Sequence, residues 1–131
     1  MNQIQHELKI NASRKRVLDA LTDRAALAHW HGAAVTGDGR EWRLVYPSGT
    51  VFRWKVVASG ADGVTWLCEE GPGNATGTQV RFALSDADAH RTRVELAHSG
   101  WQTSDPKLRT CNTLWGGLLY ELKRFAETAA A

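Results

Sequence analysis

The sequence has few prolines, few cysteines and no long apolar run. Its 131 residues include 3 prolines and 2 cysteines. Cys68 and Cys111 are too few for a disulfide framework and fall at apolar positions, so we expect buried thiols and a cytoplasmic protein. The first residues lack a basic stretch followed by an apolar run. No segment approaches the roughly 18 apolar residues of a membrane span, so we expect neither a signal peptide nor membrane insertion.

The chain also has little net charge. Lysine and arginine number 16 and aspartate and glutamate 14, which gives a net charge of +2. This excess is too small to indicate a nucleic-acid partner, and we expect none. A hydrophobic content of 43% and a charged content of 23% are ordinary for a globular protein. The length predicts a single domain over residues 1–131 that buries its own core.

Apolar and polar residues alternate along much of the chain, which predicts strands. The first is expected over residues 2–10, with His6 on its inner face. Two short helices follow, the first capped by Asn11 or Ser13 and the second over about residues 24–29. Glycine-containing turns then separate short alternating runs, which predicts an antiparallel meander. The expected inner-face residues of these runs are Trp42, Leu44, Tyr46, Phe52, Trp54, Val56, Val64, Trp66, Cys68, Val80, Phe82, Leu84, Thr92, Val94, Leu96 and His98.

The last third of the chain predicts a long amphipathic helix from Asp105 to Thr128. Asp105 would serve as the N-cap and Pro106 would occupy the first turn. Gly116 and Gly117 in its middle cost about 1 kcal/mol each relative to alanine, and close packing or a mild kink would explain them. Apolar residues recur at a spacing of three and four, at Leu108, Cys111, Trp115, Leu118, Leu119, Leu122 and Phe125.

Residues 94–101, VELAHSGW, run directly into this helix. The segment resembles the "H-x-G-W, then long helix" ending of the START-like (SRPBCC) superfamily, in the branch named after the activator of a heat-shock chaperone ATPase. Residues 10–23 and 27–30 resemble that branch's opening. The resemblance implies an α+β helix-grip fold: a curved antiparallel sheet of about six to seven strands around the long C-terminal helix. It also implies two short helices after the first strand, and a cavity between sheet and helix.

Tryptophan is unusually frequent, with 6 residues against 3 phenylalanines. Indole rings are apolar yet carry a hydrogen-bond donor, so they form either a compact aromatic core or the wall of a ligand pocket. In the pocket interpretation, Tyr46, His98 and Asn112 would be polar anchors. The resemblance places Trp30 near the mouth of the cavity. The other candidate lining residues are Trp42, Trp54, Trp66, Trp101 and Trp115.

Histidines at three places in the sequence are candidates for chemistry. His98 closes an apolar strand face, where it could hold the corner through a hydrogen bond, contact a ligand or act as a general base. Glu95 should point outward, which leaves no orienting carboxylate, so we assign no catalytic residue. His6 is either a core or rim residue or a ligand contact. The segment 29–31, His-Trp-His, is a poor match to metal-ligand spacing and predicts a loop at the cavity mouth, with neither a metal nor a cofactor.

Three functions follow from these features. The leading hypothesis is a binding protein that holds a hydrophobic or aromatic small molecule between the sheet and the C-terminal helix. The alternative, implied by the resemblance, is a co-chaperone-like interaction module that activates a chaperone ATPase. The third is a cyclase- or hydratase-like enzyme in the same cavity, for which the sequence offers no polar catalytic set. We therefore expect a binding protein rather than an enzyme, with monomer and homodimer both open.

Overall fold

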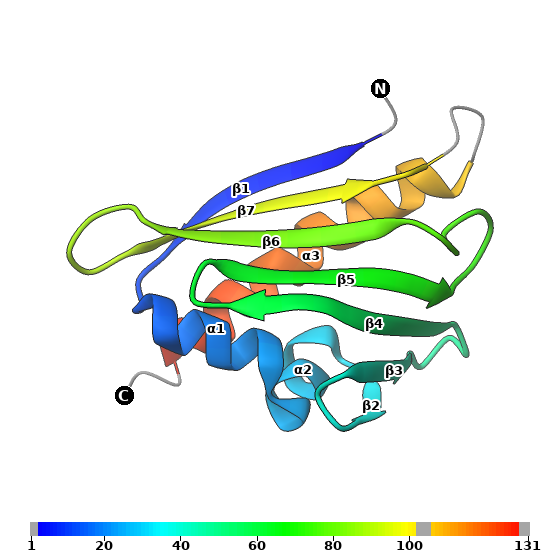
Figure 1. Cartoon of the computed structure of the whole chain (residues 1–131), viewed down its shortest axis with the longest axis horizontal. Coiled ribbons are helices and arrows are strands. Elements are labelled where there is room, and N and C mark those ends of the chain that lie inside the picture. The colour runs from blue at the N-terminus through cyan, green and yellow to red at the C-terminus, as the bar shows by residue number, and fades with distance from the viewer. Residues whose placement is uncertain (1–2, 102–105, 129–131) are drawn as a thin grey trace.

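The computed structural model describes residues 3–101 and 106–128, which form seven strands and three helices (Figure 1). Within these ranges, no helix is long and apolar enough to cross a membrane. The elements in chain order are β1 (Ile4–Ile10), α1 (Arg14–Thr22), α2 (Arg24–His31), β2 (Ala34–Gly37), β3 (Glu41–Val45), β4 (Val51–Gly60), β5 (Gly63–Glu70), β6 (Gln79–Asp86), β7 (Thr92–Ser99) and α3 (Lys107–Thr128).

The strands form one antiparallel sheet in the order β1-β7-β6-β5-β4-β3-β2. Strands β2 to β7 pair with their sequence neighbours, and β1 joins the sheet beside β7, with Ile4 opposite His98. The predicted meander is therefore confirmed. The predicted alternation of buried and exposed residues is also confirmed, since Trp54, Trp66 and Phe82 are buried on the inner face. The predicted α+β helix-grip arrangement, with two short helices after the first strand, is confirmed as well.

Local sequence signals account for the ends of the two short helices. The Ser13 side chain, rather than that of Asn11, accepts a hydrogen bond from the backbone of α1, and Asp23 caps α2 in the same way. The prediction ended the second helix near residue 29, but α2 continues to His31. It stops at Gly32, whose left-handed backbone (φ 62°) suits a C-cap without a side chain. Residues 29–31 are thus helical and do not form a loop.

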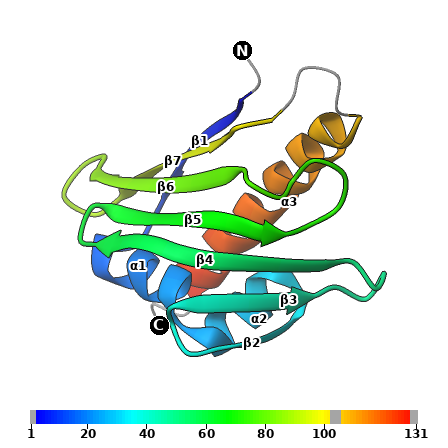
Figure 2. The ribbon, with the colours of Figure 1, turned by 45° about the vertical axis from the view of Figure 1, so that its right-hand side comes forward.

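Helix α3 runs diagonally across one face of the sheet, with α1 and α2 beside its C-terminal half (Figures 1 and 2). Its start at Lys107 follows Pro106, whereas the predicted N-cap Asp105 lies outside the described residues. Most of the predicted apolar stripe faces the sheet, as its spacing of three and four residues requires. Phe125, near its end, packs beside His29 of α2 instead. The fully buried positions of this helix are Cys111, Trp115, Leu119, Leu122 and Ala126.

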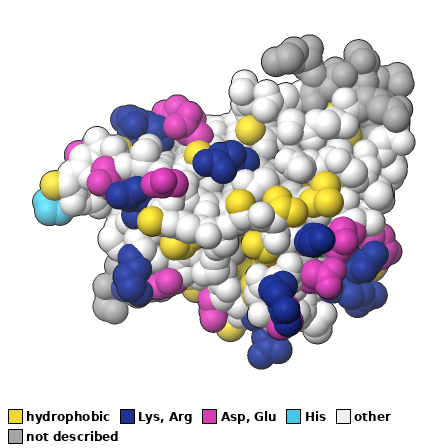
Figure 3. Space-filling view, in the orientation of Figure 1, with side chains coloured by type: hydrophobic (Ala, Val, Ile, Leu, Met, Phe, Trp, Pro, Cys, Tyr) yellow, Lys and Arg dark blue, Asp and Glu magenta, His cyan; other side chains and the backbone are white. Residues whose placement is uncertain are grey.

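The sheet bends across this helix. The pairing of β4 with β5 shifts register between Arg53 and Trp54 and again between Val56 and Ala58. Such irregularities bend a strand and increase its twist, which curves the sheet toward α3. On the outer face, Figure 3 shows basic and acidic side chains interspersed with small apolar areas. This face therefore presents no extended patch of one charge.

Candidate functional site

A cavity of about 220 Å³ lies between the inner face of the sheet and α3. Strand β4 and the β3–β4 turn form one wall, and α3 forms the other. The exposed side chains of Ser48 and Leu114 mark its open end, whereas His98 and Trp115 are buried at the other. Most of the lining is apolar or aromatic, as in typical small-molecule sites. The described lining residues are His31, Tyr46, Ser48, Thr50, Phe52, Trp54, His98, Cys111, Leu114, Trp115 and Leu118.

His98, on β7, is held in a chain of hydrogen bonds. The indole N–H of Trp115 donates to His98 Nδ1 at 2.9 Å, which makes that nitrogen an unprotonated acceptor. The proton of the neutral ring is then on Nε2, which lies 2.8 Å from the hydroxyl oxygen of Thr78. That hydroxyl donates in turn to the backbone carbonyl of Ala75. Both ring nitrogens are therefore occupied within the protein, and the chain fixes β7, the β5–β6 loop and α3 to one another.

A second histidine pairs with a tyrosine on the cavity wall. His31, at the end of α2, is 5% exposed, and its Nδ1 lies 2.7 Å from the Tyr46 hydroxyl oxygen. Its Nε2 is buried and has no hydrogen-bond partner among the described residues. The ring packs against Trp30 at 4.0 Å and approaches Trp115 edge-on at 6.3 Å between centroids. A buried polar atom without a partner costs about 1–3 kcal/mol, which marks this pair as a functional candidate.

The cavity is electrically neutral. None of its described lining residues is an aspartate, glutamate, lysine or arginine. Burial lowers the pKa of His31 to about 3 and that of His98 to about 4, so both rings are uncharged at neutral pH. Burial also raises the pKa of Tyr46, which keeps its hydroxyl protonated. The site can therefore enclose an apolar group and offer neutral hydrogen-bonding groups, but it holds no fixed charge.

Four of the residues predicted from the sequence line this cavity, and six do not. Tyr46, Trp54, His98 and Trp115 come together in the lining. His6 and Asn112 bond to each other instead, with 3.0 Å between Nε2 and Oδ1. The remaining four are buried away from the lining: Trp30, Trp42, Trp66 and Trp101.

The position of Trp30 differs most from expectation. Its ring is 1% exposed in α2, and its indole N–H donates to the backbone carbonyl of Ala20 at 2.8 Å. It thus anchors α2 on α1 and does not lie in a loop at the mouth. Trp66 and Trp101 are also buried, and their indole nitrogens have no partner among the described residues.

Sequence reasoning missed several lining residues, of which His31 matters most. The sequence contains a signal for it. His31 follows the buried Leu27 by four residues, so both lie on the same face of a helix that continues to residue 31. Phe52 lay on the predicted inner face with Trp54, and Cys111 and Leu118 lay on the predicted apolar stripe of α3. None of these had been assigned to a site, because periodicity identifies a buried face but cannot distinguish a packed core from a cavity wall.

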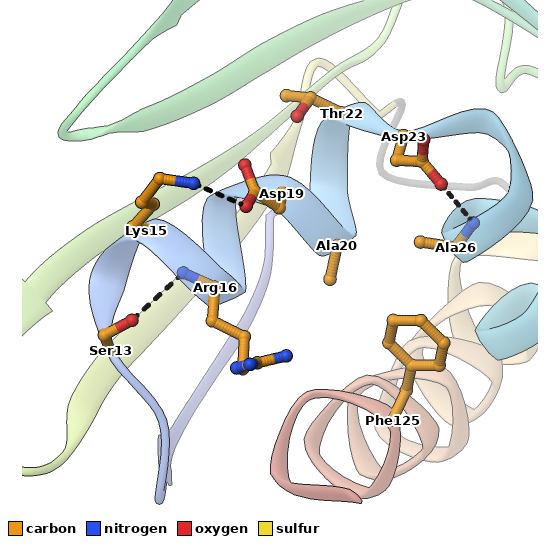
Figure 4. Close-up of a pocket in the computed structure, with 9 residues that line it drawn as sticks. All are labelled: Ser13, Lys15, Arg16, Asp19, Ala20, Thr22, Asp23, Ala26 and Phe125. Carbon is orange, nitrogen blue, oxygen red and sulfur yellow. Dashed lines mark hydrogen bonds and ion pairs between the residues drawn. The ribbon is translucent and has the colours of Figure 1, made fainter. Parts of the chain in front are cut away.

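A larger hollow of about 610 Å³ opens between α1, α2 and the end of α3 (Figure 4). Most of its polar side chains are already engaged in the helices: Ser13 and Asp23 cap α1 and α2, and Lys15 pairs with Asp19. The Arg16 side chain points into the groove. Phe125 faces this groove from α3. Because the groove is open and its side chains serve the helix ends, the cavity under the sheet is the stronger candidate.

The described residues contain no group of three or more histidine, cysteine or acidic side chains that could hold a metal ion. The two cysteines are free and buried, as predicted. Burial raises the pKa of the Cys68 thiol to about 11, which keeps it protonated and a weak nucleophile. Cys111 contributes its side chain to the cavity wall.

Comparison with known proteins identifies the family. The model of a family described as "Activator of Hsp90 ATPase homolog 1-like protein" matches residues 11–127, so the chain belongs to this family. The solution structure of the Aha1 dimer from Colwellia psychrerythraea is similar, with a TM-score of 0.85, 27% identity and 97% of each chain covered. Comparison with curated proteins gives no match.

Two further solved structures share the fold at lower identity. A protein from Mesorhizobium loti matches with a TM-score of 0.80 and 15% identity, over 94% of this chain and 95% of that one. A protein from Chromobacterium violaceum matches with a TM-score of 0.77 and 18% identity, over 97% of this chain and 99% of that one. At these identities the likeness establishes the fold alone.

Proposed function

We propose that this member of the activator of Hsp90 ATPase homolog 1-like family binds a small hydrophobic or aromatic molecule in the cavity between the sheet and α3. The observation that carries the proposal is the cavity of about 220 Å³ with its aromatic lining and its neutral hydrogen-bonding pair, Tyr46 and His31. We take the chain to act as a single domain in the cytoplasm.

The size of the cavity limits the ligand. Sites for drug-sized molecules occupy about 300–1,000 Å³, whereas an apolar cavity of about 150 Å³ is enough to bind benzene. A volume of about 220 Å³ lies between these values. The fitting ligand is therefore a single substituted ring or a molecule of similar size, and a sterol or a long fatty acid would protrude through the open end.

A ligand screen tests this function. We expect single-ring aromatic compounds to raise the melting temperature and quench tryptophan fluorescence, because a ligand at 100 times its Kd stabilises the native state by about 2.7 kcal/mol. Flavonoids, sterols and fatty acids serve as larger comparison compounds and should have weaker effects.

A matched pair of variants on α3 locates the binding. Cys111→Phe fills the cavity from its wall, whereas Thr113→Phe places the same ring at an exposed position two residues away. We expect the first variant to lose binding and the second to retain it, with both unfolding cooperatively. Equal binding by the two variants, or no hit among single-ring compounds, would contradict the proposal.

The second candidate function is a protein-interaction module that stimulates a chaperone ATPase, as the description of the family suggests. Support comes from α3, where Leu114 and Tyr120 expose large hydrophobic side chains, 52% and 59% accessible. Measuring the ATPase rate of purified Hsp90 with and without the full chain tests it. A rate that does not change at saturating chain would exclude this function.

Two other possibilities carry less support. An enzyme in this cavity would need a group that exchanges protons near neutral pH. Both nitrogens of His98 are bonded, burial keeps His31 uncharged, and no described lining residue is acidic. The Colwellia protein is described as a dimer. We therefore propose a homodimer as the alternative to a monomer for this chain. Light scattering on the purified protein distinguishes the two.

A further inference from the structure

We propose, building on the function proposed above, that the cavity selects an uncharged hydroxylated aromatic molecule. The ligand's ring lies among the aromatic side chains, and its hydroxyl group donates a hydrogen bond to the oxygen of Tyr46, which His31 holds in place. The corresponding anions are rejected. Three features of the cavity lead to this ligand class. Its described lining carries no charged side chain, most of its polar groups are already hydrogen-bonded within the protein, and the Tyr46–His31 hydrogen bond has a defined direction.

The missing charge excludes anions. A carboxylate that enters an apolar cavity loses its hydration, and this cost is recovered only where a cation or several donors replace the water. No described lining residue is a lysine or arginine. The two histidines are also uncharged, because burial lowers the pKa of each well below neutrality.

Among the polar groups of the described lining, Tyr46 is the one that can hydrogen-bond a ligand. His98 uses both ring nitrogens within the protein, so it offers a ligand neither a donor nor an acceptor. At the open end, the Ser48 hydroxyl donates to that of Thr50 at 3.0 Å. Among the described residues, the Tyr46 hydroxyl bonds to His31 alone, and its oxygen can take a second hydrogen bond.

The direction of the Tyr46–His31 bond decides what the ligand must supply. An imidazole nitrogen is a better acceptor than a phenol oxygen, so the Tyr46 hydroxyl donates to Nδ1 and the ring proton is on Nε2. The imidazole ring lies 4.0 Å from the ring of Trp30 and 6.3 Å from that of Trp115 between centroids, and an N–H group is tolerated better against aromatic rings than a lone pair. The Tyr46 oxygen is left with its lone pairs. A ligand that bonds to Tyr46 therefore has to donate, which a phenol does and a ketone does not.

Isothermal titration of the full chain at neutral pH with four single-ring compounds tests the inference. The compounds are p-cresol, toluene, acetophenone and benzoate. One neutral hydrogen bond corresponds to about a three- to tenfold gain in affinity, so p-cresol should bind that much more tightly than toluene or acetophenone. Benzoate should bind at least about tenfold more weakly than p-cresol.

Two tyrosine variants provide the matched comparison. Tyr46→Phe removes the proposed acceptor together with the hydrogen bond to His31. We expect the affinity for p-cresol to fall to that for toluene while toluene binding stays the same. Tyr120→Phe makes the same change at an exposed position of α3 and should leave all four affinities unaltered. The nitrogen-15 shifts of His31 report the tautomer, and they should show a protonated Nε2 and an unprotonated Nδ1 in the wild type.

The outcomes separate this inference from the function on which it rests. If toluene binds and p-cresol binds no more tightly, the hydroxyl selection is wrong and the binding function stands. Acetophenone or benzoate binding as tightly as p-cresol, or a protonated Nδ1, would likewise overturn the selection alone. If none of the four compounds binds, both the function and this inference fail.

Discussion

The polar side chains under the sheet form a chain of hydrogen bonds, so that losing one group leaves its neighbour without a partner. His98 accepts from the indole of Trp115 and donates to the hydroxyl of Thr78, which donates to a backbone carbonyl. Thr78 is fully buried, so no water replaces a lost partner. Removing one hydroxyl would leave a buried N–H group unsatisfied, which costs more than the bond itself contributes.

Thr78→Val removes that hydroxyl at nearly constant volume. We expect the free energy of unfolding to fall by about 1–3 kcal/mol, because His98 Nε2–H then has no acceptor. Urea denaturation measures the loss. Thr78→Ser retains the hydroxyl and is the control, with an expected loss below about 1 kcal/mol. Equal losses in the two variants would show that the methyl group and not the hydrogen bond stabilises this site.

The buried histidines also predict how stability depends on pH. The folded state holds His31 and His98 uncharged down to pKa values of about 3 and 4, whereas the unfolded chain protonates them near 6.5. Below pH 6.5 the unfolded state therefore binds more protons, and stability falls as pH decreases toward 4. Each histidine contributes a slope of up to about 1.4 kcal/mol per pH unit.

Urea denaturation between pH 4.5 and 7.5 measures this slope. His98→Asn should reduce it by the share of one histidine, because the amide carries no titrating group. His90→Asn makes the same substitution at an exposed residue in the β6–β7 turn and is the matched control. A slope that His98→Asn does not alter would mean that His98 is protonated in the folded protein.

At the scale of elements, α3 combines a buried stripe with an exposed face that is not optimised for helix stability. Gly116 and Gly117 have ordinary negative φ values, and the space around a Cβ at Gly117 is empty to 4 Å. At Gly116 a Cβ would lie 3.7 Å from His6, which is an ordinary contact. A Cβ therefore fits at both positions, and these distances give no packing reason for either glycine.

Gly117→Ala should therefore stabilise the protein by about 1 kcal/mol, the difference in helix propensity between the two residues. Thermal and urea unfolding both measure the gain. Thr113→Ala, at another exposed position of α3, should give a smaller gain and serves as the reference for propensity alone. A loss of stability in Gly117→Ala would show that the helix needs the flexibility of glycine at this point.

The elements themselves could be predicted from the sequence to a large extent. Alternation placed Trp54, Trp66 and Phe82 on the inner face, and the spacing of three and four residues gave the buried stripe of α3. The predicted second helix ends two residues before α2 does. In sequence, His29-Trp30-His31 resembles the start of a loop, whereas the left-handed C-cap at Gly32 lets the helix continue to His31. That small error removed His31 from the predicted site.

The distribution of the tryptophans could not be predicted in the same way. All those assigned to the sheet and α3 are buried, as expected, yet only Trp54 and Trp115 line the cavity. Which rings face an empty volume depends on how deeply α3 packs into the curved sheet, and this depth is set by side chains far apart in the sequence. Periodicity carries no information about it.

At the scale of the whole molecule, the cavity results from the shape of the fold. The meander curves around α3, and α1 and α2 fill the space between the sheet and the C-terminal half of the helix (Figure 2). Toward the other half, the β3–β4 turn and α3 leave a volume that no helix occupies. The fold thus combines a packed core at one end with an open, lined cavity at the other, and the proposed ligand site is that cavity.

An NMR titration of the nitrogen-15-labelled full chain with p-cresol tests this account most directly, because the 6 tryptophans supply indole N–H signals from both parts of the molecule. We predict saturable shifts of the Trp54 and Trp115 indole signals, whose rings line the cavity, and much smaller shifts for Trp42, which lies outside it. Binding that leaves Trp54 and Trp115 unshifted, or an absence of any saturable shift, would contradict the proposal that this cavity is a ligand site.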